Sequence, residues 1–141
     1  MSNVRVMVTS FGYGHDRAPH ADLTLDVRRR FRNPHHDPAM RQLTGLDAPV
    51  RQHVLDTPGV TTLIDTTAAV VRGLVTATAD APNVQVAVGC VGGRHRSVAI
   101  AEAVGAALEA AEIAVVVWHR DLDRDVLPSG TQQHLDQDDP R

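Results

Sequence analysis

The chain has 141 residues, of which 43% are hydrophobic, and its formal net charge at pH 7 is −3 with histidine counted as neutral. This composition is typical of one globular domain and excludes a strongly basic nucleic-acid binder. Lysine is absent and all fourteen Lys+Arg positions are arginine. A P-loop NTPase of the usual kind is therefore excluded, because its phosphate-binding loop needs a lysine.

The only cysteine is Cys90, so an internal disulfide is excluded. No charged segment followed by a long apolar one opens the chain, and no apolar run approaches the length needed to cross a bilayer. We therefore expect a cytoplasmic protein without a membrane partner.

The first half of the chain predicts two strands, a loop and two helices. Residues 4–10 are rich in β-branched side chains, and residues 21–27 alternate apolar and polar side chains. The arginine-, histidine- and proline-rich stretch 28–45 has no clear period, which predicts a loop with one helical turn after Asp37. Asp47 is expected to cap a short helix over residues 48–55. A longer helix is expected from Pro58 through about residue 79, because apolar side chains recur there at helical spacing: Val60, Leu63, Ile64, Thr67, Val71 and Leu74.

The second half predicts two more strands around one helix. Residues 84–89 read as a short buried strand and residues 114–119 as another strand, and residues 96–111 form an alanine-rich helical pattern. Its apolar stripe comprises Ile100, Val104, Leu108 and Ala111. The polar end of the chain predicts a single domain over residues 1–126 followed by a flexible tail over 127–141.

A strand, a helix and another strand in this order predict a parallel pair with a right-handed crossover. The expected fold class is therefore α/β, with a small parallel or mixed sheet and flanking helices. Ligands of such sheets bind beyond the carboxyl ends of the strands, which is where the segment GCVGGRHRS (residues 89–97) falls.

This segment has the features of an anion site. Gly92 and Gly93 allow successive backbone N–H groups to point inward, and the following helix adds its positive end. Arg94 and Arg96 add charge, and Ser97 adds a hydroxyl group. The alternative is a tight turn with exposed arginines.

A catalytic interpretation of the same segment is a cysteine-dependent phosphatase. Cys90 and Arg96 have the C-x5-R spacing of that class, and Ser97 follows the arginine. Such an enzyme also needs a general-acid aspartate, for which Asp37 and Asp121 are candidates. The alternative for Cys90 is a small buried residue at the end of a strand, which the sequence favours.

Other polar residues allow two interpretations each. His35, His36 and Asp37 could suggest a metal, but a site needs three or four convergent ligands, so we expect none. After the second strand, Arg28 and Arg30 would share one face of an extended segment and contact a pocket or RNA, or lie in solvent. His119 and Arg120, before Asp121, would line the same pocket or form a local ion pair.

Four irregular motifs in order are similar to the C-terminal domain of the RapZ family of RNase adapter proteins. They are SFGYG (10–14), DVRRRFRNPHHDPAMRQLTGLDAPV (26–50), GCVGGRHRS (89–97) and WHRDLDRD (118–125). The resemblance covers about residues 4–125. Val91 stands where the family loop usually has threonine, and the SFGYGHDRAP stretch lacks the lysine common there.

The resemblance implies a fold like the C-terminal subdomain of phosphofructokinase and a non-catalytic, regulatory role. It implies a pocket for a phosphorylated amino sugar, binding of a structured RNA and formation of a homo-oligomer, with no cofactor. The pocket residues that it implies are His35, Gly92, Gly93, His95, Arg96 and Ser97. The ATP-binding domain that precedes this domain in the family has no counterpart in the sequence.

Overall fold

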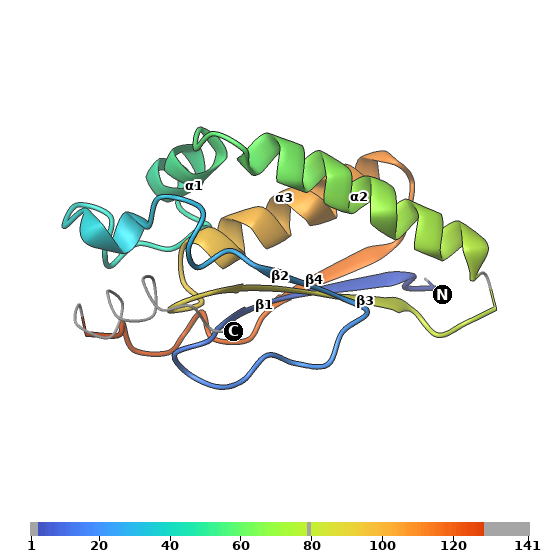
Figure 1. Ribbon diagram of the computed structural model, residues 1–141, viewed down its shortest axis with the longest axis horizontal. Helices are drawn as coiled ribbons and strands as arrows, with labels where there is room; N and C mark the ends of the chain where they lie inside the picture. Colours follow the sequence, from blue (N-terminus) through green and yellow to red (C-terminus); the bar gives the residue numbers. More distant parts are fainter. Residues whose placement is uncertain (1–2, 79, 129–141) are drawn as a thin grey trace.

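The computed structural model of the chain describes residues 3–78 and 80–128, and its centre is a four-stranded sheet (Figure 1). All strands run parallel in the order β2-β3-β1-β4. Their bounds are β1 Val6–Gly12, β2 Leu23–Asp26, β3 Val84–Cys90 and β4 Val115–His119. The predicted α/β class is confirmed, and the sheet is parallel throughout.

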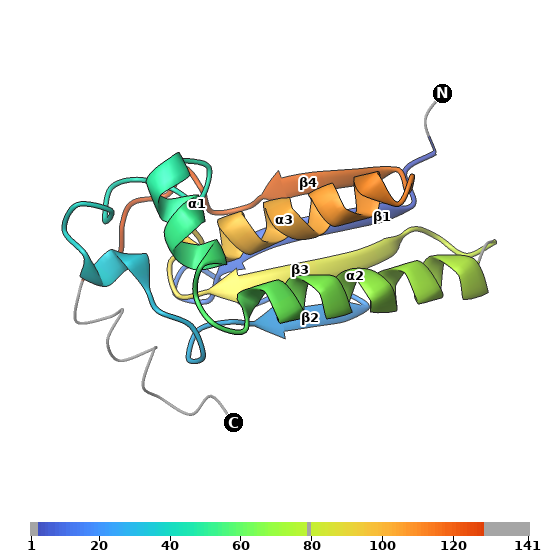
Figure 2. The ribbon, with the colours of Figure 1, turned by 90° about the horizontal axis from the view of Figure 1, so that it is seen from above.

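Three helices cover one face of this sheet: α1 (Ala48–Leu55), α2 (Val60–Ala77) and α3 (Arg96–Ala110). Figure 2 shows α2 and α3 side by side above the strands, with α1 across the end at which α3 begins. The loop that joins β1 to β2 runs back along the opposite face, on which no helix of residues 3–78 or 80–128 lies (Figure 1). The sheet therefore has one helix-covered face and one helix-free face.

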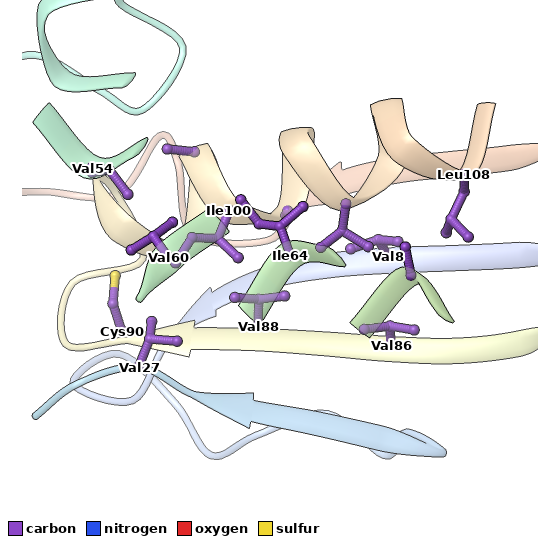
Figure 3. Packing of buried hydrophobic residues seen from close by; sticks show 14 of the residues in the cluster. Val8, Val27, Val54, Val60, Ile64, Val86, Val88, Cys90, Ile100 and Leu108 are labelled. Atoms are coloured by element: carbon purple, nitrogen blue, oxygen red, sulfur yellow. The ribbon is translucent and has the colours of Figure 1, made fainter. Parts of the chain in front are cut away.

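The hydrophobic core lies between the sheet and the helices (Figure 3). Alternate residues of β1 and β3 point toward the helices, and Val8 and Val88 are fully buried among them. Ile100, Val104 and Leu108 form the buried stripe of α3 that the sequence predicted. Ala111 does not belong to it, because it is the exposed C-cap residue of the helix.

The expectation that no segment could span a membrane is wrong for α2 by length and composition. Its 18 residues have a mean hydropathy of 1.2. In this fold, however, α2 packs on the sheet with one side and contributes to the core, and 28% of its residues are buried. The same composition is found in core helices of globular domains, so it is weak evidence for a membrane span.

Several predicted bounds shift for local reasons. The helical turn in the long loop precedes Asp37 instead of following it: it spans Pro34–His36, because the Asn33 side chain accepts a hydrogen bond from the His35 N–H. Asp47 is the N-cap residue of α1, but its carboxylate accepts from the Thr44 N–H at 2.8 Å and does not cap the helix.

The longer helix begins at Val60 and not at Pro58, because Gly59 has a left-handed φ of 94°. The strands predicted over residues 4–10, 21–27 and 114–119 begin one or two residues later, and β1 continues to Gly12. Most of the predicted tail, residues 129–141, lies outside the described residues.

Candidate functional site

The carboxyl ends of all four strands lie at one end of the sheet, and the loops that follow them gather there (Figure 2). The segment 89–97 has the expected strand–loop–helix form: β3 ends at Cys90 and α3 begins at Arg96. In the loop between them, Gly92 and Arg94 are partly exposed, whereas Val91, Gly93 and His95 are buried. The loop is thus built into the protein and presents only a small part of its backbone.

Two glycines determine the conformation of this loop. Gly93 has a φ of 68°, and a Cβ atom added to it would lie 2.6 Å from the Gly12 nitrogen. A Cβ atom on Gly12 would lie 2.5 Å from the Gly92 carbonyl carbon. The loops after β1 and β3 therefore pack backbone to backbone, and the Tyr13 N–H donates to the Cys90 carbonyl at 2.9 Å. No side chain fits at either contact.

The Cys90 side chain points into the hydrophobic core. It is 3% exposed and lies near Val27 in Figure 3. Its thiol donates to the Ser97 hydroxyl oxygen at 3.1 Å. The contact with a hydroxyl group matches the phosphatase interpretation, but enclosure by apolar side chains is typical of a structural cysteine.

Arg96 is 1% exposed and holds the turn that follows β2. Its Nη1 donates to three carbonyl oxygens, those of Arg28 at 2.6 Å and of Val27 and Phe31 at 3.2 Å. Val27, Arg28 and Phe31 are distant from Arg96 in sequence, but their carbonyl groups lie against the first turn of α3. The guanidinium group thus ties this turn to the start of the helix.

Arg94 connects two other loops in the same manner. Its guanidinium group donates to the carbonyl oxygens of Gln42, of Leu43 at 3.0 Å and of Leu122 at 3.5 Å. Both arginines of the loop therefore donate to backbone carbonyls of the protein. The loops lack regular secondary structure, so hydrogen bonds from these charged side chains satisfy backbone carbonyls that would otherwise have no partner.

Arg120 and Asp121 fix the loop that follows β1. Arg120 donates to the carbonyl oxygens of Arg17 at 2.7 Å and Asp16 at 3.2 Å, and it pairs with Asp121 at 2.8 Å. The buried Asp121 carboxylate also accepts from the Gly12 N–H at 2.7 Å. Burial raises the pKa of Asp121. The hydrogen bonds from Arg120 and Gly12 lower this pKa by more than burial raises it, so it lies below its usual 3.8.

His35 and His95 come together from separate segments. His95 is 4% exposed, and its Nε2 lies 3.1 Å from the Arg41 carbonyl oxygen. Burial lowers the pKa of His95 to about 4, against the opposing effect of that hydrogen bond, and nearby His35 lowers it further. His95 is therefore neutral at pH 7. His35 is 1% exposed, and its carbonyl accepts from Arg41 Nε at 2.9 Å.

Arg28 and Arg30 do not share one face, because residues 28–30 form a turn and not an extended segment. Arg28 is buried; its Nη2 pairs with Asp26 at 2.6 Å, and its guanidinium carbon lies 3.7 Å from the centre of the Tyr13 ring. Arg30 is exposed. The two side chains therefore have different surroundings.

His119 lies in a polar contact that the sequence did not indicate. Its Nδ1 lies 2.6 Å from the Ser10 hydroxyl oxygen, and its Nε2 lies 2.7 Å from the Glu102 carboxylate. Since an ionised carboxylate only accepts, we assign the proton to Nε2, and the Ser10 hydroxyl then donates to Nδ1. The strand alternation could have placed Ser10 on the buried side with Val8, where a hydroxyl group needs a partner.

The exposed side of the NPHHDP segment borders a hollow of about 370 Å³. The lining residues are Arg32, Asn33, His36, Asp37 and His53. His36 lines this hollow, whereas the neighbouring His35 is buried and does not. Within residues 3–78 and 80–128, no three His, Cys, Asp or Glu side chains are grouped to hold a metal ion.

The comparisons with known proteins agree with this geometry. The family model described as RapZ C-terminal domain matches residues 4–123. A "Nucleotide-binding protein" of Heliobacterium modesticaldum is 38% identical over 126 residues, and one of Thermobifida fusca is 42% identical over 126 residues. Each alignment covers 88% of this chain but only 42% of the relative, so the chain spans about two fifths of their length. The chain belongs to the RapZ C-terminal domain family.

Proposed function

We propose that this chain is a non-catalytic, regulatory binding domain for a small phosphorylated molecule of the amino-sugar phosphate type. The observation that carries the proposal is the Gly92–Gly93 backbone, which is fixed against Gly12 and separated by only two residues from the 15-residue helix α3. A rigid backbone before a helix suits an anion, because N–H groups and the helix dipole act together.

The contacts of the two loop arginines indicate which groups would hold the anion. Arg94 and Arg96 donate to protein carbonyls, so in this proposal they position the loop and the backbone amides hold the phosphate. The ring of His95 is neutral and buried beside His35, so in this proposal both histidines support the pocket from within the protein. Binding of this kind needs no nucleophile, which agrees with the burial of Cys90.

The names of the relatives describe nucleotide binding by those longer proteins. A nucleotide and a sugar phosphate share the phosphate group and differ in the rest of the ligand. We therefore propose a phosphosugar as the ligand of this domain and include a nucleotide among the compounds to be tested.

We expect glucosamine-6-phosphate to raise the melting temperature of the wild-type protein, whereas glucosamine and inorganic phosphate give a smaller shift. A ligand at 100 times its Kd adds about 2.7 kcal/mol, which corresponds to several degrees for a domain of this size. Gly92→Asp is expected to abolish the shift, because a carboxylate would then face the phosphate. Differential scanning fluorimetry with these compounds and ATP measures both effects.

Gly73→Asp is the matched control, since Gly73 lies on α2 with open space around its Cα. It should keep the full response. Equal shifts with every phosphate compound would contradict the proposed ligand class. Phosphate release that is lost in Cys90→Ser would contradict non-catalytic binding and support the phosphatase alternative, for which the Cys90–Ser97 contact is the favourable observation.

RNA binding is the second part of the proposal. In the described part of the chain, five exposed arginines belong to the loops at the carboxyl edge of the sheet: Arg17, Arg29, Arg30, Arg32 and Arg124. Arginines at such positions suit the phosphate backbone of a structured RNA, while the aromatic side chains are too few for readout by stacking.

Binding of a structured RNA should weaken steeply with salt. Each neutralised phosphate adds nearly one unit to the slope of log K against log salt concentration, so the double variant Arg29→Gln/Arg30→Gln should reduce that slope by about 2. Fluorescence anisotropy between 50 and 200 mM salt measures it. Affinity that does not respond to salt would rule out this part of the proposal.

A further inference from the structure

Asp121 is the only buried carboxylate in the part of the chain that the structure describes, and its side chain is fully enclosed. It follows β4 and lies among the loops at the carboxyl edge of the sheet. Burying a charge is costly unless the charge is paired and hydrogen-bonded. A carboxylate at such a place therefore needs fixed donors around it.

Three residues supply those donors. The Gly12 N–H donates to Asp121 Oδ2 at 2.7 Å, and Arg120 Nη2 donates to the same oxygen at 2.8 Å. Arg124 Nε lies 3.3 Å from Oδ1. Burial raises the pKa of Asp121, but the hydrogen bonds from Arg120 and Gly12 lower it by more, so Asp121 is ionised at pH 7. An ionised carboxylate has no proton to give, which argues against Asp121 as the general acid of a phosphatase.

Arg120 and Asp121 together hold Gly12 at both sides of its backbone. Asp121 accepts from the Gly12 N–H, and Arg120 Nη2 donates to the Gly12 carbonyl oxygen at 3.4 Å. The Arg120 backbone is itself fixed, because its N–H donates to the Ser10 carbonyl oxygen of β1 at 3.0 Å. The last residue of β1 is therefore held in place by the segment that follows β4.

Gly12 in turn determines where the backbone of Gly92 and Gly93 lies. A Cβ atom added to Gly93 would lie 2.6 Å from the Gly12 nitrogen and 3.0 Å from the Asp121 Cβ atom. The nitrogen that donates to Asp121 is thus the atom against which Gly93 packs. Because no space remains between the two loops, a displacement of Gly12 must also displace Gly92 and Gly93.

We propose that Asp121 is the positioning residue of the anion site: by holding the Gly12 N–H, it keeps Gly12 against Gly93 and so sets the place of the Gly92 and Gly93 amides. This inference rests on the proposed binding of a phosphate group by those amides. Asp121 itself does not contact the ligand and acts through Gly12. Groups that must converge on one ligand lose affinity when the residues behind them let them move.

A purely structural role for Asp121 makes a different prediction. A carboxylate that only stabilises the fold changes the melting temperature, but it leaves the affinity of the folded protein for its ligand unchanged. The decisive quantity is therefore the dissociation constant, measured well below the melting temperature of each variant. Isothermal titration calorimetry with glucosamine-6-phosphate provides it.

Asp121→Ala should weaken the binding of glucosamine-6-phosphate by about tenfold or more, because the Gly12 N–H loses its buried acceptor. Asp121→Asn keeps an acceptor oxygen but has no charge to pair with Arg120, so we expect an intermediate loss of about threefold. In the ligand-free Asp121→Ala protein, the amide signals of Gly12, Gly92 and Gly93 should move in a ¹H–¹⁵N correlation spectrum.

Two control variants separate position from stability. Asp22→Ala removes a carboxylate that also accepts a backbone N–H, that of Gln85 at 2.8 Å, but at the opposite end of the sheet. Leu108→Ala destabilises the protein by truncating a fully buried side chain in the last turns of α3, away from the loops that form the site. Both variants should bind glucosamine-6-phosphate as the wild type does.

Wild-type affinity in a folded Asp121→Ala protein would overturn the positioning role and leave the proposed function intact. The same loss of affinity in Leu108→Ala would also overturn it, because lower stability alone would then explain the effect. If Asp121→Ala does not fold, Asp121→Asn decides, and unchanged affinity in that variant overturns the role. A wild-type protein that binds no phosphate compound would overturn both the role and the proposed function.

Discussion

Replacing Arg96 by methionine should lower the free energy of unfolding by about 4 kcal/mol. Methionine keeps the apolar contacts of the buried stem but leaves the carbonyls of Val27, Arg28 and Phe31 without their charged donor. For a domain of this size, such a loss corresponds to a fall of the melting temperature by roughly 10 °C. Urea unfolding followed by circular dichroism measures it.

Arg30→Met is the control for this experiment, because Arg30 is an exposed arginine only two positions from Arg28. It should change the free energy of unfolding by less than about 0.5 kcal/mol. Similar losses in both variants would show that the carbonyl contacts of Arg96 do not stabilise the fold. The expected loss is also why Arg96 is a poor choice for testing ligand binding.

Acid should destabilise the protein well above the range in which carboxylates titrate, because of His95. Its pKa falls from 6.5 in the unfolded chain to about 4 in the folded protein. Between these values the unfolded chain binds a proton that the folded protein does not bind, so stability decreases as the pH falls. The full loss from His95 is about 3 kcal/mol at pH 4.

The measurement is urea unfolding at half-unit steps from pH 7 to pH 4.5. His95→Gln should flatten the decline, whereas His20→Gln, at an exposed position, should keep it. The pKa values of Asp26 and Asp121 are also lowered, but their stabilisation is lost only as the pH falls below about 3.8. If stability still decreases to the same extent with falling pH in His95→Gln, His95 is not the cause of the acid destabilisation. His15, whose burial lowers its pKa, adds a smaller effect of the same sign.

The regular elements were predictable because their signals are local. The spacing of Val60, Ile64 and Val71 predicts the buried side of α2 wherever that helix packs. The strand–loop–helix form of residues 89–97 follows from the glycines and the apolar run before them. In both cases the physical cause lies within a few residues of its effect.

The conformation of the long loop was not predictable, because distant residues determine it. Its first turn is held by Arg96, and its later part is held by Arg94. Neither contact leaves a periodic signal in the segment 28–45, and composition alone indicated a loop. The turn at residues 28–30, which separates Arg28 from Arg30, has the same origin.

The sequence predicted that residues 89–97 form a loop between a strand and a helix, but spacing does not determine the direction of a side chain. The C-x5-R pattern is consistent with an arginine that grips a phosphate, yet the Arg96 guanidinium contacts three carbonyls. The partner of His119 was missed for a related reason. Glu102 lies on α3, and only the packing of that helix on β4 brings the two together.

The position of β1 in the sheet has a consequence for how the chain reaches its native state. Of the four strands of this sheet, β1 is synthesised before the others and lies in the interior, with Val6 in register with Val84 on one side and Val115 on the other. Its two neighbours, β3 and β4, are therefore made long after it, and until then its backbone N–H and C=O groups are not paired in a sheet. Such distant pairing slows folding and prolongs the exposure of aggregation-prone intermediates. We expect the yield of native protein to be decided before β4 leaves the ribosome.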